Sequence, residues 1–212
     1  MTNYRRCRIS GGTYFFTVNL ANRRQSLLTD HIQLLRDAFR EVLTAHPFTI
    51  QAIVVLPAHL HCLWELPEAD SDYSTRWRQI KSAFSRALPH GERISASRTS
   101  KSERGIWQRR FWEHNIRDDA GFATRFDYIH YNPVKHGHVQ QVTDWPYSSF
   151  TATCCVAITQ AIWSAMGSRT WNWRKVRWES RCSTHPACSL VGGGQAHENR
   201  PPYFALAYIM RR

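Results

Sequence analysis

Apolar residues recur with two different periods along the first 150 residues. Dense or alternating runs of β-branched and aromatic residues predict strands at 14–20, 49–55, 60–66 and 107–117. Apolar stripes with helical spacing predict two helices, the first carrying Ile32, Leu35, Phe39 and Val42 and the second carrying Trp77, Ile80, Phe84 and Leu88. A third helix, packed through Phe122, Phe126 and Ile129, follows the last strand. The order β-α-β-β-α-β-α predicts an α+β fold, an antiparallel sheet backed by two helices, with a third helix after it.

Polar residues and prolines mark where these elements begin and end. Asp30 is a candidate N-cap for the first helix, and Asp118 or Asp119 for the third. Pro133 is expected to end or kink the third helix. Residues 89–104 are rich in Ser, Arg and Lys without periodicity, which predicts a flexible loop or a disordered insertion.

Residues 151–212 differ in character from the rest of the chain. Four tryptophans lie there among Arg, Ser and Cys with weak periodicity, so the predicted layout is one domain at 1–150 and a basic Trp/Cys-rich tail at 151–212. The tail is either a basic DNA-binding extension or a sequence without stable structure of its own. Its metal-ligand residue types lack the paired short spacings of a zinc module: Cys154, Cys155, Cys182, His185 and Cys188.

The net charge of the chain indicates what kind of molecule it binds. The chain holds 28 Lys and Arg against 16 Asp and Glu, a formal +12 with a pI near 9.9, which favours nucleic acid or another polyanionic surface. Aromatic residues interleaved with arginines favour nucleic acid, because aromatic faces accept unstacked bases. The start of the sequence has no apolar signal region and no apolar run is long enough to span a bilayer, so we expect a cytoplasmic protein with no membrane partner.

Two histidines alternate on the third predicted strand. His59 and His61 project from one strand face while Leu60, Cys62 and Trp64 line the other. Two imidazoles on one face can hold one divalent metal ion, and a tyrosine beside that metal could attack a phosphodiester and form a covalent bond to nucleic acid.

Four phrases of the sequence, in order, resemble the REP-associated tyrosine transposases, a branch of the His-hydrophobe-His single-tyrosine nucleases. The phrases are GGTYFFTVNL (11–20), VVLPAHLH (54–61), WQRRFWEH (107–114) and YIHYNPVKHG (128–137). The resemblance covers about Tyr4 to Phe150 and implies a ferredoxin-like, RRM-like sheet whose third helix carries the nucleophile. It implies a monomer rather than a dimer.

The resemblance also implies roles for individual residues. Tyr128 is the nucleophile, with Tyr131 and Tyr147 as rivals, and Mg²⁺ or Mn²⁺ is held by His59 and His61. Related transposases supply a third ligand with an amide four residues after the tyrosine, which is Asn132 here. His136 is the competing third ligand.

The implied activity is that of a metal-dependent endonuclease and strand-transferase on single-stranded, hairpin-forming DNA, through a 5′-phosphotyrosine link. The alternatives are a replication initiator or relaxase, and a non-catalytic hairpin-binding protein. The candidate phosphate contacts are Arg5, Arg6, Arg23, Arg24, Arg76, Arg78, Lys81, Arg109, Arg110 and Lys135.

Overall fold

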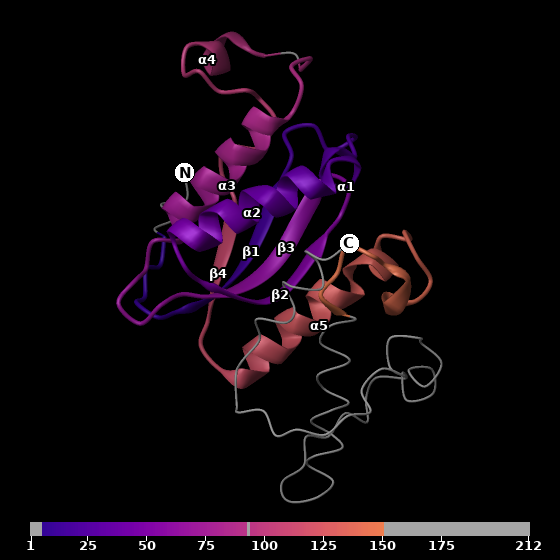
Figure 1. Cartoon of the computed structure of the whole chain (residues 1–212). Helices are drawn as coiled ribbons and strands as arrows, with labels where there is room; N and C mark the ends of the chain where they lie inside the picture. The colour runs from indigo at the N-terminus through magenta and orange to yellow at the C-terminus, as the bar shows by residue number, and fades with distance from the viewer. Residues whose placement is uncertain (1–5, 93, 151–212) are drawn as a thin grey trace, which may run out of the picture. The chain divides into compact units, whose positions relative to one another are not determined.

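The computed structural model describes residues 6–92 and 94–150, and every structural statement below concerns these residues. They form a four-stranded antiparallel sheet with helices on both faces (Figure 1). Its strands are β1 (Thr13–Asn19), β2 (Thr49–Val55), β3 (His59–Glu65) and β4 (Trp112–Ile116), in the spatial order β2-β3-β1-β4. With β1 and β3 at the centre this is the ferredoxin-like arrangement, so the predicted α+β fold is confirmed.

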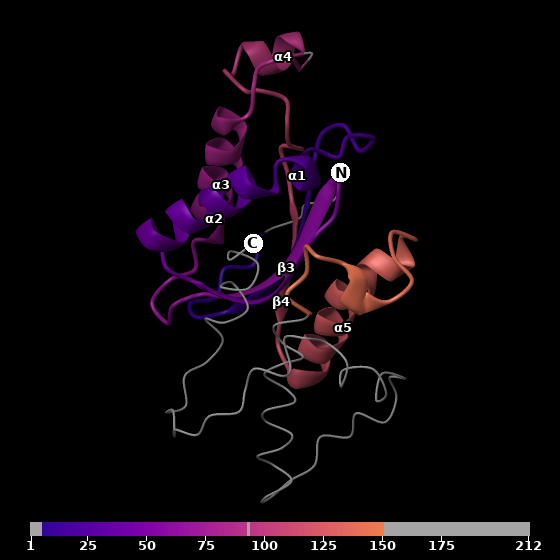
Figure 2. The same ribbon diagram turned by 45° about the vertical axis from the view of Figure 1, so that its right-hand side comes forward.

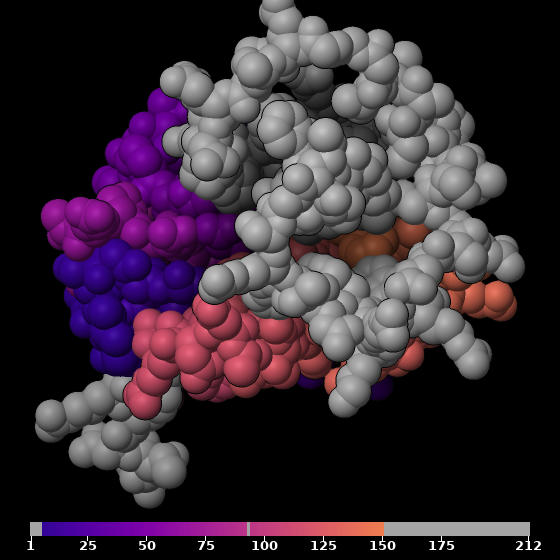
Figure 3. Space-filling model, turned by 90° about the horizontal axis from the view of Figure 1, so that it is seen from below, coloured from indigo at the N-terminus to yellow at the C-terminus, as the bar shows by residue number. Residues whose placement is uncertain are grey.

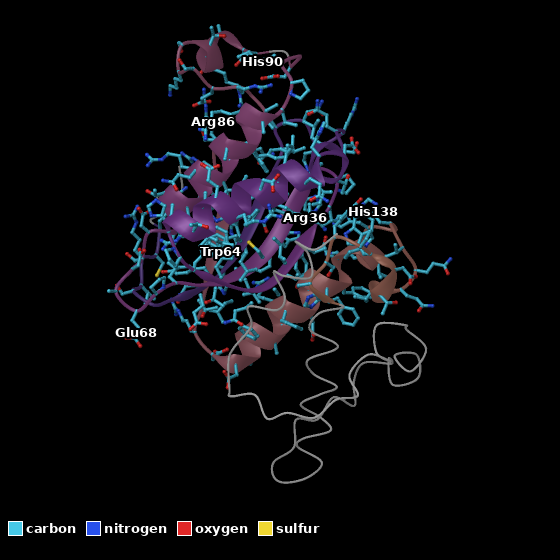
Figure 4. The ribbon with its side chains drawn as sticks, in the orientation of Figure 1. Arg36, Trp64, Glu68, Arg86, His90 and His138 are labelled. Atoms are coloured by element: carbon cyan, nitrogen blue, oxygen red, sulfur yellow. The ribbon has the colours of Figure 1, made fainter. Side chains whose placement is uncertain are left out.

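Two long helices, α2 (Ile32–Ala45) and α3 (Tyr73–Ala87), cover one face of the sheet. The core between them is built on Trp64 of β3, which is labelled in Figure 4. It stacks on Trp77 of α3 with ring centroids 4.3 Å apart. Both indoles are fully buried. Large aromatic rings of this kind bury the most apolar area per residue, so this pair fixes α3 against the sheet.

The third long helix, α5 (Asp119–Lys135), lies on the opposite face of the sheet from α2 and α3 (Figure 2). It packs through Ile129 against a second, smaller apolar cluster that includes Phe15, Val54 and Leu63. Seen from below, α5 forms a surface next to the indigo N-terminal residues (Figure 3). Successive residues of the central strands therefore enter two different cores, as strand geometry requires.

The helix starts differ in part from the predictions. Asp118 caps α5 by accepting from the Gly121 N–H at 2.7 Å, as predicted. The prediction for Asp30 was wrong, because this residue ends a separate one-turn helix, α1 (Leu27–Asp30), where its carboxylate accepts from the hydroxyl of Ser26. α2 begins after His31 without a side-chain cap.

The predicted strand at 107–117 is shorter in the structure, where β4 spans only Trp112–Ile116. Trp107 makes one isolated bridge to Leu20 and turns its indole toward α3, donating to the Lys81 carbonyl at 3.2 Å. The Lys81 ammonium in turn donates to the Gln108 carbonyl at 2.6 Å. These bonds hold the residues before Trp112 to α3, and the pairing with β1 is interrupted between Trp112 and Gln108, whose N–H donates to the Asn19 carbonyl at 3.0 Å.

The segment at 89–104 is also more ordered than predicted, since it contains the helical turn α4 (Ala96–Thr99). Arg104 closes the segment by pairing with Glu92 at 2.6 Å and donating to the carbonyls of Leu88 and Pro89. These contacts are polar, so the periodicity of apolar residues does not reveal them.

Past α5 the chain forms the short 3-10 helix Val142–Asp144 and then runs beside β2, where the Val55 N–H donates to the Tyr147 carbonyl at 2.8 Å. Within the described ranges, no helix has the length and apolarity to cross a bilayer. The predicted tail at 151–212, with its cysteines and His185, lies outside the described residues.

Candidate functional site

His59 and His61 lie on the face of β3 that α5 covers, as their alternation predicts. Their ring centroids are 5.0 Å apart and both side chains are buried. The intervening Leu60 points into the opposite core beneath the helices. Alternation on one strand therefore brings the two imidazoles together without any help from a loop.

Neighbours on β1 orient His61. Thr17 is its cross-strand partner, and the threonine Oγ1 lies 2.8 Å from the His61 Nδ1. The ring of Phe15 stacks on the imidazole with an interplanar angle of 18°. The His61 Nε2 is buried and has no hydrogen-bond partner among the described residues. If Nδ1 carries the ring proton and donates it to Thr17, Nε2 presents a free lone pair.

Both imidazoles are held neutral near pH 7. Burial lowers the pKa of His59 to about 4, with a further contribution from His136 and Arg23. Burial lowers the pKa of His61 to about 3, helped by His59 and His136. A neutral imidazole is the form that binds metal ions, so the pair needs no deprotonation step before coordination.

Tyr128 lies on α5 directly beside this pair. Its ring centroid is 5.1 Å from that of His61 and 5.9 Å from that of Phe15, in edge-on contact with both. The Lys135 ammonium lies 5.1 Å from the centre of the phenol ring. The next residue, Ile129, is fully buried against the sheet and so fixes the rotation of the helix that presents the tyrosine.

Asn132, one turn after Tyr128, is 0 % exposed. Neither its amide oxygen nor its amide nitrogen has a hydrogen-bond partner of normal geometry in the described part of the chain. The amide does lie close enough to His59 to raise the pKa of that imidazole against the larger effect of burial. A fully buried amide without partners costs free energy, so its retention beside the histidines points to a ligand role.

Pro133 was predicted to end or kink the helix; it does not end it, since α5 continues to Lys135 and Asn132 is helical. The helix ends in a Schellman arrangement: the His138 N–H donates to the Pro133 carbonyl at 3.0 Å, and Gly137 adopts a φ of 71°. Asn132 and Tyr128 therefore keep the four-residue spacing that places two side chains on one helix face.

His136, the competing third ligand, follows the end of α5 and its ring centroid lies 5.3 Å from that of His59. Its side chain is exposed, in contrast to Asn132. Across residues 6–92 and 94–150, no three His, Cys, Asp or Glu side chains are arranged to hold a metal ion. The structure thus brings both candidates near His59 but buries only the asparagine.

The two rival tyrosines lie in different surroundings. Tyr131 is 57 % exposed on α5. Tyr147 packs against Trp145 at 5.6 Å and belongs to the segment beside β2. Within the described residues, Tyr128 is the one of these three tyrosines whose ring contacts a histidine of the pair, His61.

The basic candidates separate into two groups. Arg23 and Lys135 lie near the histidines, where their positive charges help to lower the pKa of the imidazoles. Arg24 belongs to neither group and is exposed in the loop after β1. A second group lines a cavity of about 760 Å³ between α3 and residues 98–111, and comprises Arg6, Arg78, Lys81 and Arg109. Arg110 is exposed, and Arg5 lies outside the described residues.

Arg76 is a structural residue, so its interpretation as a phosphate contact was wrong. Its guanidinium is buried, pairs with Asp70 at 2.8 Å and donates to the carbonyls of His46 and Pro47. These bonds satisfy the charge inside the protein and join α3 to the end of α2.

Sequence reasoning missed Thr17, which orients His61. The alternation of Phe15, Thr17 and Asn19 was visible in the sequence, but the pairing register that sets Thr17 opposite His61 was not. Cross-strand register depends on contacts distant in sequence, so a single strand pattern does not reveal it.

The chain is similar in sequence to a family of known proteins and to individual members of it. Residues 10–132 match the family described as "Transposase IS200 like". The chain is 51 % identical over 150 residues to the REP-associated tyrosine transposase of Escherichia coli K12, covering 71 % of this chain and 83 % of that protein. It is also 51 % identical over 151 residues to a Haemophilus influenzae protein named for the same group, covering 71 % of this chain and 86 % of the relative.

A solved structure shows the same fold. It is described as a REP-associated tyrosine transposase bound to a REP hairpin, and it is 45 % identical to this chain with a TM-score of 0.61. The similarity covers 81 % of this chain and 92 % of the other.

The burial of His61 predicts an acid-sensitive stability. The pKa of His61 is about 3 in the folded state and about 6.5 in an unfolded chain, so between these values the unfolded state binds more protons and stability falls as the pH falls. From pH 7 to pH 5 this histidine should cost about 2 kcal/mol of unfolding free energy. Urea unfolding in chelator-containing buffer at both pH values measures the loss. The variant His61→Leu should lose about 2 kcal/mol less, and an identical pH dependence in the two proteins would contradict the assignment.

Proposed function

The chain belongs to the IS200-like transposases, in the branch of REP-associated tyrosine transposases, and on that premise we propose that it cleaves and rejoins single-stranded DNA beside a hairpin, with Tyr128 as the nucleophile. The observation that carries the proposal is the position of the Tyr128 ring, whose centroid lies 5.1 Å from that of His61, one of a pair of buried, neutral histidines. The hairpin substrate is supported by the related protein whose structure is described as bound to a REP hairpin. The monomeric state implied by the sequence stays a prediction.

The donor atoms at this site fit a divalent metal ion. Two neutral imidazoles and the amide of Asn132 converge, and the His61 Nε2 and both amide atoms lack hydrogen-bond partners in the part of the chain described. Asn132 is a better third ligand than His136 because it is buried and its amide oxygen suits harder ions such as Mg²⁺ and Mn²⁺. A bound ion would supply Lewis-acid polarisation of the scissile phosphodiester.

The side chains provide the remaining chemistry. The Tyr128 Oη attacks the scissile phosphorus, a P–O(Tyr) bond forms and the P–O3′ bond breaks, which leaves a 5′-phosphotyrosine and a free 3′-OH. The phenol proton is lost and the 3′ oxygen gains one, so charge balances. Lys135, whose ammonium faces the phenol ring, stabilises the negative charge that develops on the tyrosine and the phosphate.

Rejoining is the reverse reaction. A 3′-OH of another strand attacks the phosphotyrosine, the P–O(Tyr) bond breaks and Tyr128 is restored. The phosphotyrosine conserves the energy of the phosphodiester, so the proposal needs no nucleotide cofactor.

We also propose that residues 1–150 form the catalytic domain and that the basic tail at 151–212 adds only affinity for DNA. The four motifs and all the site residues precede residue 151. Two relatives match this chain over 150 and 151 residues, about the length of the proposed domain.

The nucleophile is tested by removing one oxygen atom. Tyr128→Phe should retain hairpin binding and lose all covalent protein–DNA adduct, because only the attacking hydroxyl is absent. The assay is denaturing gel electrophoresis with a labelled hairpin oligonucleotide and Mn²⁺. Tyr131→Phe is the matched control and should form adduct at the wild-type rate. Adduct in Tyr128→Phe, or none in Tyr131→Phe with binding intact, would move the assignment; hairpin binding by the wild type without adduct would indicate a non-catalytic binder.

The metal site is tested by titration as well as by activity. Asn132→Ala and His59→Ala should each weaken Mn²⁺ binding about 10- to 100-fold, measured by calorimetry without DNA, since each removes one donor. His136→Ala should bind Mn²⁺ within about threefold of the wild type, given the ordinary size of effects from exposed side chains. Equal affinities for Asn132→Ala and the wild type, with loss in His136→Ala, would exchange the two roles. Adduct formation that resists a chelator would overturn the metal proposal.

The domain boundary is tested by truncation after Phe150. The shortened protein should remain folded and form adduct, and its DNA binding should be weaker and less steeply dependent on salt, by about 0.7 to 0.9 in the log-log slope for each phosphate that the tail no longer neutralises. Circular dichroism and binding across a salt series measure both. An unfolded fragment would show that tail residues belong to the core.

A further inference from the structure

Trp112 is exposed although it sits next to the candidate site. It begins β4, the edge strand beside β1, and is 45 % exposed. By contrast Trp64, Trp77 and Trp107 are buried in the core. An exposed tryptophan leaves a large apolar surface in water, and such surface commonly marks a binding site.

The exposed indole belongs to a cluster of three neighbouring side chains, Trp112, His114 and Arg125, which we term the β4 platform. The indole and the His114 imidazole lie parallel to within 4°, with ring centroids 5.8 Å apart. They share the face of β4 that α5 covers, because their cross-strand partners are Thr17 and Phe15. The Arg125 guanidinium, from α5, lies 5.6 Å from the centre of the Trp112 ring.

The β4 platform is continuous with the nucleophile. The Phe15 ring lies 5.6 Å from that of Trp112 and 5.9 Å from that of Tyr128, in edge-on contact with both. Arg125 also covers Phe15, at 5.2 Å, and precedes Tyr128 by three residues on α5. One aromatic ring therefore separates the platform from the tyrosine, and a polymer bound at Tyr128 can reach both.

The chemistry of the platform selects an unpaired nucleobase. Aromatic faces beside a guanidinium are the combination that binds single-stranded nucleic acid, because the ring stacks on a base and the cation meets the phosphate. A base inside a duplex has both faces covered by its neighbours and has none to offer an indole. Stacking tolerates any base, so the platform contributes affinity and position rather than sequence readout.

We propose that the β4 platform stacks one unpaired base of the DNA strand that flanks the scissile phosphate, with Arg125 against the adjoining phosphate. The inference rests on the proposed function, since Tyr128 defines where the scissile phosphate lies. The stacked base anchors the strand on one side of the nucleophile and holds the phosphorus in line for attack.

The test is a double-mutant cycle between protein and DNA in the full-length chain. Tyr128→Phe serves as the background, so that binding is measured without cleavage. The probes are a hairpin oligonucleotide with unpaired flanks and a series in which one flank nucleotide at a time is abasic. Trp112→Ala should weaken binding of the intact probe about 5- to 150-fold.

The cycle identifies the stacked base. One abasic position should weaken binding to the parent protein but not to Trp112→Ala, because the partner of that base is already absent. Trp112→Phe keeps a ring and should bind within about threefold of the parent. Tyr131→Ala, which removes another exposed aromatic ring, should show the parent pattern at every position. Circular dichroism confirms that each variant is folded.

The outcomes separate this inference from the proposed function. If the chain with intact Tyr128 forms adduct on the hairpin but every abasic penalty is the same with and without Trp112, the platform inference is wrong and the nuclease assignment stands. If no adduct forms, the proposed function fails, and the inference falls with it. A non-zero interaction energy in the double-mutant cycle between Trp112 and one flank position, with none at the other positions, supports the proposal that this base stacks on the platform.

Discussion

The constraint on which the rest of the site depends is the burial of β3 on both faces. One face of this central strand packs Leu60 and Trp64 beneath α2 and α3, and the other carries His59 and His61 beneath α5. Because both faces are covered, the imidazoles cannot gain full hydration, and burial is the largest cause of the lowered pKa of each. A strand that supplied the core on one side only would leave the same two residues in water, where they would be partly protonated near neutral pH.

Helix α5 both covers the second face of the sheet and carries two of the candidate site residues, Tyr128 and Asn132. α5 packs on the sheet through the fully buried Ile129, with Phe122 and Phe126 against the same cluster, and Tyr128 then lies beside His61 and Asn132 close to His59. Pro133 removes the bond that an N–H at this position would donate to the Ile129 carbonyl, and only Val134 and Lys135 follow it in α5. The helix stops in a Schellman end at Gly137, directly after His136, whose ring centroid lies 5.3 Å from that of His59.

Much of this arrangement could be predicted from sequence, because it rests on local periodicity. Alternation places His59 and His61 on one face, and the four-residue step from Tyr128 to Asn132 places both on one helix side. The failures share a cause, which is dependence on partners distant in the chain. The register that sets Thr17 against His61, the shortening of β4 by bonds to α3, and the commitment of Arg76 to Asp70 each need tertiary contacts that no local pattern contains.

The positive charges near the site act in two ways that reinforce each other. Arg23 and Lys135 lower the pKa of the buried histidines, since a nearby cation disfavours a second one. The same cations attract a phosphate. Lys135 in addition lies over the Tyr128 ring, with its ammonium 5.1 Å from the ring centre. A carboxylate in the position of Lys135 would oppose both effects, because it would favour protonated imidazoles and repel the phosphate. The basic composition of the chain is therefore part of how the site works, beyond its role in binding a polyanion.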